Sequence, residues 1–384
     1  MIYLDNAATS FPKPPEVIRT VCEHMQRLGG SAGRSGRTMA LEVDRAVYEA
    51  RGRLARLIGV RDAARLVFTF NATDALNMAL KGYLVPGDHC IVSSLEHHAV
   101  VRPLRRLEGE GVTVSRLPYR PGVGADPADL AALIQPNTRL LAVIHASNVT
   151  GEILPIRELC AAARERGLRT LVDASQTAGC VPLDAETDGI DLLALTGHKA
   201  LLGPQGTGAL YVAPGVELRP LREGGTGSQS SQSEQPSLLP DRLESGTLNG
   251  PGIAGLGIAA EWLLNRGVET VRVEEIRRTQ RLLGGLADMA GVIVYGPADA
   301  HQRVGVVSIN FGETDPATAA LRLEDEFGVI TRAGLHCAPW AHACLGTLGQ
   351  GTVRLSLSPF TTEAEVDAAL EAVAAVAAEL VRYE

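Results

Sequence analysis

Two residues in the middle of the chain, Asp173 and Lys199, have the types and the spacing that carbonyl chemistry requires. Asp173 ends the strand-like run 168–172, and Lys199 follows the apolar run 192–195 by a short turn. Because the carboxyl ends of strands in an open α/β sheet face one crevice, the two side chains can converge on a single ligand. A lysine beside an apolar core is readily deprotonated and attacks carbonyl carbons, and a carboxylate can keep a pyridine nitrogen protonated. Pyridoxal phosphate is a cofactor that needs both groups.

The same two residues could also have ordinary structural roles, since Asp173 could cap a helix and Lys199 could be a solvated residue after a strand. Their surroundings favour the cofactor site. Gln176 follows the acid by three positions, and the glycines within residues 203–208 leave room where the backbone must approach another group.

The composition is typical of a globular protein with a large core. The chain has 384 residues, of which 45% are hydrophobic, so one or two domains are expected. Its formal net charge of -8, without a block of Lys or Arg, argues against a surface for nucleic acid or for an anionic membrane. No basic leader begins the sequence and no segment reaches the about 18 apolar residues of a membrane span, so we expect a cytoplasmic protein. The six scattered cysteines are typical of reduced thiols.

The order of the expected elements divides the chain into two parts. Strands at 66–70, 89–93 and near 112 and 140 alternate with helices at 39–58, from 100 and at 155–167, a rhythm that predicts βαβ winding and a mostly parallel sheet. From residue 253 the pattern is of long helices, strands at 292–295 and 304–311, a helix to 327, a strand to 331 and a last helix from 363. This second pattern predicts a smaller α+β domain.

Three segments around the acid and the lysine carry a family resemblance. VDASQ at 172–176, TGHK at 196–199 and GPQGTG at 203–208 resemble the cofactor core of the class V aminotransferase superfamily, and most closely that of its cysteine desulfurases. The resemblance extends over nearly the whole chain, from the segment 5–9 to Arg354. It implies a pyridoxal phosphate enzyme of fold type I that works as a homodimer. Its large doubly wound domain would span residues 12–255 and its small C-terminal domain residues 256–384, with residues 1–11 joining the small one.

The resemblance also implies which residues hold the cofactor. A threonine at a helix start can bind a phosphate, although capping alone would explain Thr73 equally well. His97 would stack on the pyridine ring and transfer protons, and Asn148 and Gln176 would hold the phenolic oxygen of the ring. Thr247 would reach the phosphate of the cofactor in the other subunit. The full set of expected cofactor-binding residues is Ala72, Thr73, His97, Asn148, Asp173, Gln176, Thr196, His198, Lys199 and Thr247.

The resemblance places the substrate between two further parts of the chain. Arg354 matches the arginine that binds the substrate carboxylate, and Cys337 matches the nucleophilic cysteine. Asn148, Ala8 and Arg34 complete the expected substrate-binding set, with Arg34 reaching across the dimer from a glycine-rich loop.

Three roles for Cys337 must be compared from the sequence alone. A single cysteine is most often a packed core thiol, and with His336, His342 and Cys344 nearby it could be a metal ligand. The paired CxxC spacing of structural zinc sites is missing, so no metal is expected. A nucleophilic thiol requires a base or a positive group nearby, and Leu335 stands where the family ordinarily has a second histidine.

The family resemblance implies conversion of L-cysteine to L-alanine. Lys199 would move the α-proton, and Cys337 would take the sulfur as a persulfide for delivery to an acceptor protein, as in iron–sulfur cluster assembly. The short segment between Cys337 and Arg354 resembles the SUF-type branch. A selenocysteine lyase, with L-selenocysteine as substrate, and another class V aminotransferase remain alternatives. A nucleotide- or metal-binding protein that uses the loop 224–232 or the Cys337 region is an alternative of another class.

Overall fold

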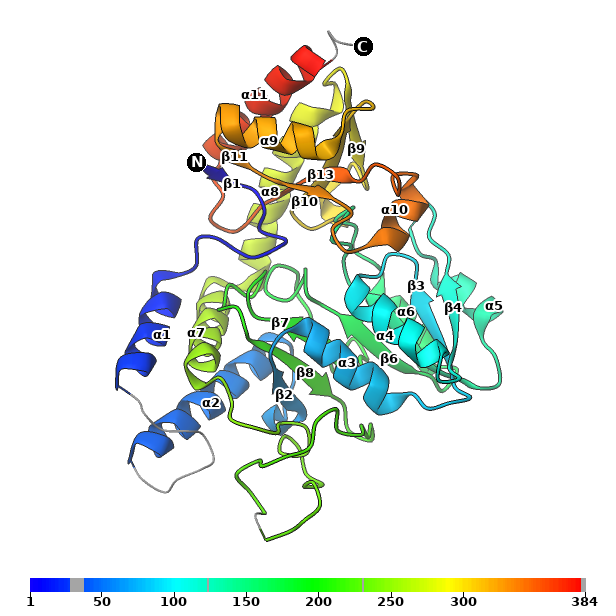
Figure 1. Cartoon of the computed structure of the whole chain (residues 1–384), viewed down its shortest axis with the longest axis vertical. Helices are drawn as coiled ribbons and strands as arrows, with labels where there is room; N and C mark the ends of the chain where they lie inside the picture. Colours follow the sequence, from blue (N-terminus) through cyan, green and yellow to red (C-terminus); the bar gives the residue numbers. More distant parts are fainter. Residues whose placement is uncertain (28–37, 123, 230, 381–384) are drawn as a thin grey trace.

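The computed structural model describes residues 1–27, 38–122, 124–229 and 231–380, which form two bodies of unequal size. Figure 1 shows the larger body, built on a wide sheet, below the smaller one, and it shows the beginning of the chain and the last described helix in the smaller body. Two clusters of buried apolar side chains correspond to these bodies.

A seven-stranded sheet forms the centre of the larger body. Its strands lie in the order β2 (Leu66–Thr69), β8 (Gly208–Val212), β7 (Leu192–Thr196), β6 (Arg169–Asp173), β5 (Thr138–Ile144), β3 (His89–Ser93) and β4 (Thr113–Leu117). β8 runs antiparallel to both of its neighbours, and the strands from β7 to β4 are parallel. β7 is buried along its whole length, which explains why residues 192–195 are apolar without alternation.

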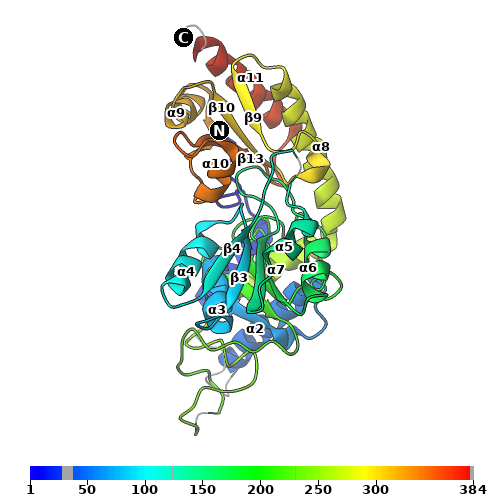
Figure 2. The ribbon, with the colours of Figure 1, turned by 90° about the vertical axis from the view of Figure 1, so that its right-hand side faces the viewer.

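Helices cover both faces of this sheet, as the rhythm of the sequence predicts. Figure 2 shows α3 (Ala72–Tyr83) and α4 (His98–Glu108) on one face, and α5 (Leu130–Leu133), α6 (Ile156–Arg164) and α7 (Gly250–Arg266) on the other. α7 packs against α1 (Pro15–Arg27) and α2 (Thr38–Leu57). Short 3-10 turns lie at Ala63–Arg65 and Pro127–Asp129.

A four-stranded antiparallel sheet forms the smaller body. Its order is β12 (Arg332–Gly334), β13 (Thr352–Ser356), β10 (Val306–Phe311) and β9 (Val292–Tyr295), and its helices are α8 (Val268–Ala287), α9 (Pro316–Phe327), α10 (Pro339–Leu345) and α11 (Glu363–Leu380), with a 3-10 turn at Ala300–Gln302. β1 (Ile2–Tyr3) pairs in parallel with β11 (Val329–Ile330), and Leu4 is buried in the smaller cluster. The first residues of the chain thus pack with its last third.

The α/β class and the mostly parallel sheet that the sequence predicts are confirmed, with small differences at element ends. α4 begins at His98 rather than at residue 100, because the His97 side chain caps it by accepting from the Ala99 amide at 3.0 Å. β10 begins at Val306 rather than at 304, because the Val304 amide donates to the Gly151 carbonyl at 2.9 Å instead of to a strand. The expected boundary at residues 255/256 falls inside α7, whose apolar side chains as far as Leu263 belong to the larger cluster.

Candidate active site

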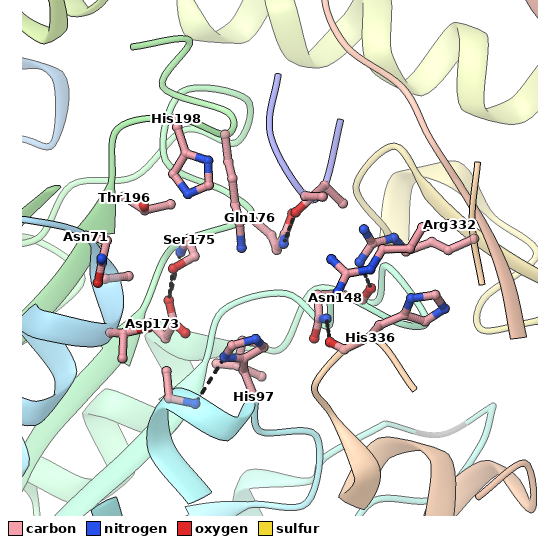
Figure 3. A pocket seen from close by; sticks show the side chains of 18 residues that line it. Asn71, His97, Asn148, Asp173, Ser175, Gln176, Thr196, His198, Arg332 and His336 are labelled. Carbon is pink, nitrogen blue, oxygen red and sulfur yellow. Dashed lines mark hydrogen bonds between the residues drawn. The ribbon is translucent and has the colours of Figure 1, made fainter. Parts of the chain in front are cut away.

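The parallel strands β3, β5, β6 and β7 all end at one edge of the large sheet, and a cavity of about 260 Å³ lies there against the smaller body. Figure 3 shows its lining side chains. They come from the strand ends, from the start of α3, from the chain beginning and from the smaller body. The lining residues are Ala7, Ala8, Asn71, Ala72, Thr73, His97, Ala99, Ile144, Asn148, Asp173, Ser175, Gln176, Thr196, His198, Lys199, Arg332, His336 and Arg354.

The turn after β7 holds Lys199 against the cavity. The Gly197 amide donates to the Thr207 carbonyl at 2.8 Å, and the Gly203 amide donates to the Gly197 carbonyl at 2.7 Å. A Cβ on Gly197 would lie 2.0 Å from Thr207 Oγ1, so only glycine fits this turn. Desolvation lowers the pKa of Lys199 to about 8, and the negative charge of Asp173 opposes that shift. A neutral amine is therefore accessible near neutral pH.

Asp173 ends β6 with its side chain 3% exposed. Burial raises the pKa of this carboxyl, and the hydrogen bonds from Ser175 oppose the shift. The Ser175 amide donates to Asp173 Oδ1 at 2.9 Å, and the Ser175 hydroxyl donates to the same oxygen. This local turn fixes the direction of the carboxylate, as Figure 3 shows.

The beginning of α3 and the turn after β7 form a polar end of the cavity. Asn71 caps α3 by accepting from the Asp74 amide at 3.0 Å, so Thr73 is free of the capping role that the sequence allowed it. Thr196 Oγ1 and His198 Nδ1 are buried and have no hydrogen-bond partner in the described part of the chain. Unpaired buried polar atoms beside a helix N-terminus suit an anionic group such as a phosphate.

His97 lies at the start of α4 and faces the cavity (Figure 3). Its Nδ1 accepts from the Ala99 amide at 3.0 Å, so the ring proton of the neutral form is on Nε2. Burial and the nearby charge of Lys199 lower the pKa of His97 to about 3, which keeps the ring neutral. The preceding Glu96 is wholly buried, and its Oε1 accepts from the Ile144 amide at 2.6 Å.

Arg354 and Asn148 form the end of the cavity nearest the smaller body. Arg354 Nη2 donates to Asp5 Oδ1 at 2.8 Å, and its Nη1 donates to the Asn148 carbonyl at 3.1 Å. Arg332 lies opposite Arg354 in the β12–β13 register and also lines the cavity. The Asn148 side-chain amide donates to the His336 carbonyl at 2.7 Å, while its Oδ1 is buried and has no partner among the described residues.

Cys337 lies beside this cavity but is exposed and is not among its described lining residues. The Ala338 amide donates to the Leu335 carbonyl at 2.9 Å, and His336 and Cys337 have φ of +48° and +59°, the signature of a type I′ turn. The carbonyl of Cys337 accepts from the His98 amide at 2.7 Å, which ties the turn to the larger body.

His336 is buried behind the cysteine turn and is not a free proton donor. Its Nε2 bonds to the Thr352 carbonyl at 3.2 Å, so that nitrogen carries the proton, and its Nδ1 has no partner among the described residues. Burial and the charge of Arg354 lower the pKa of His336 to about 2.

The cavity brings together most of the predicted site residues. Of the residues predicted from the sequence, the lining includes Ala8, Ala72, Thr73, His97, Asn148, Asp173, Gln176, Thr196, His198, Lys199 and Arg354. Thr247 instead lines a separate, smaller cavity together with Phe70 and Arg222. Arg34 lies outside the described residues.

Several residues that line the cavity were not predicted from the sequence as site residues. A serine two positions after an acid is a common local turn and could have indicated Ser175. Asn71 precedes a helix and could have been recognised as its cap. Arg332 and His336 carried no signal beyond their nearness to Cys337, and they come to the cavity only through the tertiary fold.

Two negative findings concern only the residues that the structure describes. Among them, no group of three or more His, Cys, Asp or Glu side chains could hold a metal ion. None of the helices in these ranges is long and apolar enough to cross a membrane.

Comparisons with known proteins agree on one family. The family model "Aminotransferase class-V" matches residues 2–369. A probable cysteine desulfurase of Methanothermobacter thermautotrophicus is 34% identical, over 95% of this chain and 92% of that protein. The cysteine desulfurase IscS of Anaeromyxobacter dehalogenans is 33% identical, over 96% and 90%.

Solved structures agree as well. An apo cysteine desulfurase from Thermococcus onnurineus NA1 has a TM-score of 0.91 at 29% identity, over 100% of this chain and 95% of that one. The cysteine desulfurase CsdA from Escherichia coli has a TM-score of 0.87 at 30% identity, over 99% and 95%. The chain belongs to the class-V aminotransferases. Within them it is a member of the cysteine desulfurase family, with the fold of type I pyridoxal phosphate enzymes.

Proposed function

We propose that this chain is a pyridoxal phosphate-dependent cysteine desulfurase, which converts L-cysteine to L-alanine and takes the sulfur on Cys337. The observation that carries the proposal is the convergence of Asp173, Lys199 and Arg354 on one cavity beside an exposed cysteine. The named activity of the relatives, which match nearly the whole chain, supports it.

The residues present fit the cofactor. The unpaired Thr196 and His198 atoms and the start of α3 suit the phosphate, and Asp173 suits the ring nitrogen. Lys199 would bond to the aldehyde carbon, and His97 would stack on the face of the ring. The side-chain amides of Asn148 and Gln176 would bind the phenolic oxygen. Pyridoxal phosphate, when bound, supplies the electron sink that stabilises the charge left by removal of the α-proton.

The chain's own residues perform the remaining tasks. Arg354 binds the substrate carboxylate, and the neutral amine of Lys199 takes the α-proton. His97 holds a proton on Nε2 that it can donate. The Cys337 thiolate attacks the substrate sulfur, forming an S–S bond while the C–S bond breaks and its electron pair passes to the substrate carbon. The β-carbon takes a proton and becomes the methyl group of alanine. Lys199 returns a proton to the α-carbon, so a cysteine and a thiol give an alanine and a persulfide.

The exposed position of Cys337 suits delivery of the sulfur to another protein. Because the thiol is exposed and lies outside the cavity lining, its persulfide is accessible to an acceptor protein. We propose delivery to such an acceptor, as in iron–sulfur cluster assembly, by a cytoplasmic homodimer in which Thr247 and Arg34 act across the subunit interface.

Replacement of Cys337 tests the reaction. Cys337→Ser should retain the visible spectrum of the loaded protein and still bind L-cysteine, but it should form almost no alanine, because a hydroxyl is a poor attacker at sulfur. The matched control is Cys344→Ser, since Cys344 is half-buried seven positions away and should be nearly neutral.

Mass spectrometry after a single turnover should find the added sulfur on the peptide that contains Cys337. Sulfur on Cys344, or ordinary turnover by Cys337→Ser, would refute the assignment of the nucleophile. Retained activity of Cys337→Ser on L-selenocysteine alone would indicate a selenocysteine lyase, because selenium can leave without attack by a thiol.

A further inference from the structure

The guanidinium of Arg354 is buried and held from two sides. Its side chain is 1% exposed, Nη2 donates to Asp5 Oδ1 at 2.8 Å, and Nη1 donates to the Asn148 carbonyl at 3.1 Å. The third nitrogen, Nε, is buried and has no acceptor among the described residues. Since a buried donor without an acceptor is costly, this edge of the guanidinium is where a ligand oxygen is most favourably added.

Asp5 reaches Arg354 on a backbone that is fixed on both sides. The Leu4 amide donates to the Ile330 carbonyl at 2.9 Å, and the Ser356 amide donates to the Leu4 carbonyl at 2.6 Å. The Asp5 carbonyl accepts from the Ala8 amide at 3.1 Å. The side chain of Asp5 is only 19% exposed. The carboxylate therefore lies on a rigid support, although its nearest neighbours come from the far end of the sequence.

We propose that Asp5 is a positioning residue for substrate recognition, which orients the Arg354 guanidinium so that its free Nε–H edge meets the α-carboxylate of an amino-acid substrate. This inference rests on the proposed function, because it takes Arg354 as the group that binds the carboxylate. Asp5 touches Arg354 and acts through it.

Asp5 also sets the charge of this end of the cavity. Arg332 and Arg354 are neighbours in the β12–β13 register, and both line the cavity. Two adjacent guanidiniums repel each other, and the ion pair with Asp5 compensates one of them. No described carboxylate forms an ion pair with Arg332, so one positive charge remains uncompensated. This balance suits a substrate with a single carboxylate.

The test replaces Asp5 by Ala and by Asn in the holoenzyme. In Asp5→Ala the KM for L-cysteine should rise about tenfold while kcat changes by less than about twofold, because the loss concerns binding of the carboxylate. Asp5→Asn should show a smaller rise, since its amide oxygen can still accept from Nη2. Binding of L-cysteinamide, which has no carboxylate, should be unchanged in both variants when followed by the visible spectrum.

A matched control is Asp191→Asn. Asp191 is 16% exposed and pairs with Arg169 at 2.7 Å, but it precedes β7 at the opposite edge of the sheet from the cavity. This variant should lose a similar ion pair and keep the KM for L-cysteine.

An unchanged KM in Asp5→Ala would overturn the inference, and a lower KM would show that Asp5 competes with the substrate for Arg354. Equal losses for cysteine and cysteinamide would indicate general distortion and would overturn it too. A wild-type protein that forms no alanine would refute the proposed reaction instead. Asp5 would then be tested by the binding of L-alanine against L-alaninamide, which requires no sulfur chemistry and should separate the variants in the same way.

Discussion

Two charged side chains are buried at the cavity, Asp173 at the end of β6 and Lys199 in the turn after β7. Burial shifts the pKa of each. It lowers the pKa of Lys199 to about 8 and raises that of Asp173. The attraction between the two groups opposes both shifts, because each favours the charged form of the other. Ser175 donates two hydrogen bonds to Asp173, which stabilise the ionised carboxylate. The cationic form of the nearby Lys199 is destabilised by burial. The site thus lowers the pKa of its lysine while local hydrogen bonds support the carboxylate.

Lys199 should react with an aldehyde at a lower pH than an ordinary lysine does. Only the neutral amine attacks an aldehyde, so a lowered pKa moves the reaction to lower pH. We expect covalent attachment of pyridoxal phosphate to the apoprotein to rise with pH about a midpoint near 8, rather than near the 10.5 of an unperturbed lysine. Stopped-flow absorbance with buffers from about pH 6 to 10 would measure it.

Two variants complete this experiment. Lys199→Ala should fold but show no borohydride-reducible attachment. Asp173→Asn should move the midpoint further down, because the charge that raises the pKa of Lys199 is removed. A midpoint near 10.5, or the same reducible attachment in Lys199→Ala, would contradict the assignment of the lysine.

At the residue scale, the sequence predicts the site residues that lie at or just after the ends of strands. Asp173 and Lys199 were predictable because an apolar run ending in a polar residue indicates both the strand and its crevice. The pair of Asp5 and Arg354 was not, because its members lie 349 positions apart and only the tertiary fold brings them to 2.8 Å. The exposure of Cys337 was likewise not predictable, since a lone cysteine has the same sequence pattern in a core and in a turn.

At the scale of elements, α3 shows how a cap and a binding site share one helix end. Asn71 takes the cap by accepting from the Asp74 amide, which leaves the Thr73 side chain for the cavity. The residues alone do not decide between phosphate binding and capping for Thr73, because both use a hydroxyl at a helix start. The family resemblance favours the phosphate.

We predict that Asn71→Ala lowers the free energy of unfolding by about 1 kcal/mol, the usual loss for an N-cap. It should also weaken binding of pyridoxal phosphate, because the first turn of α3 loses its fixed direction at the cavity. Thermal unfolding of the apoprotein and a spectral titration with the cofactor would measure the two effects.

The control for this prediction is a cap of the same kind in the smaller body. Asp315 caps α9 by accepting from the Thr318 amide at 3.1 Å, and it does not line the cavity. Asp315→Ala should cost similar stability and leave cofactor affinity unchanged. Equal affinity in both variants would show that the α3 cap is only structural.

The cysteine turn is the element that sequence reasoning missed. A type I′ turn requires positive φ at both central residues and favours Asn, Asp or Gly there. His336 and Cys337 adopt these angles at a cost in backbone energy. The Asn148 side chain donates to the His336 carbonyl and the His98 amide donates to the Cys337 carbonyl, and both bonds stabilise the turn. The local sequence does not predict these distant partners.

At the scale of the whole molecule, Thr247 requires a second subunit for the role that the family resemblance implies. It lines a different cavity from Lys199 within the same chain. We therefore expect a dimer of the 40.5 kDa chain in sedimentation experiments. Thr247→Ala should weaken cofactor binding although the residue does not line the cavity that contains Lys199 of its own chain.

Mixed dimers would test whether Thr247 acts across the interface. Dimers of Lys199→Ala chains alone should not bind the cofactor covalently, and dimers of Thr247→Ala chains alone should bind it weakly. After mixing and exchange of subunits, one site of each mixed dimer would have both residues intact, so part of the normal cofactor binding should return. No recovery in confirmed mixed dimers would place the action of Thr247 within its own chain.

The pairing of β1 with β11 has a consequence for synthesis on the ribosome. Ile2 is translated long before its partner Val329, which emerges only after the whole large sheet has been made. At roughly 5–20 residues per second, the nascent N-terminal segment waits on the order of tens of seconds for its strand partner. The larger body can fold during that interval, whereas the smaller body can close around Leu4 only after the segments from α8 to α11 have been translated.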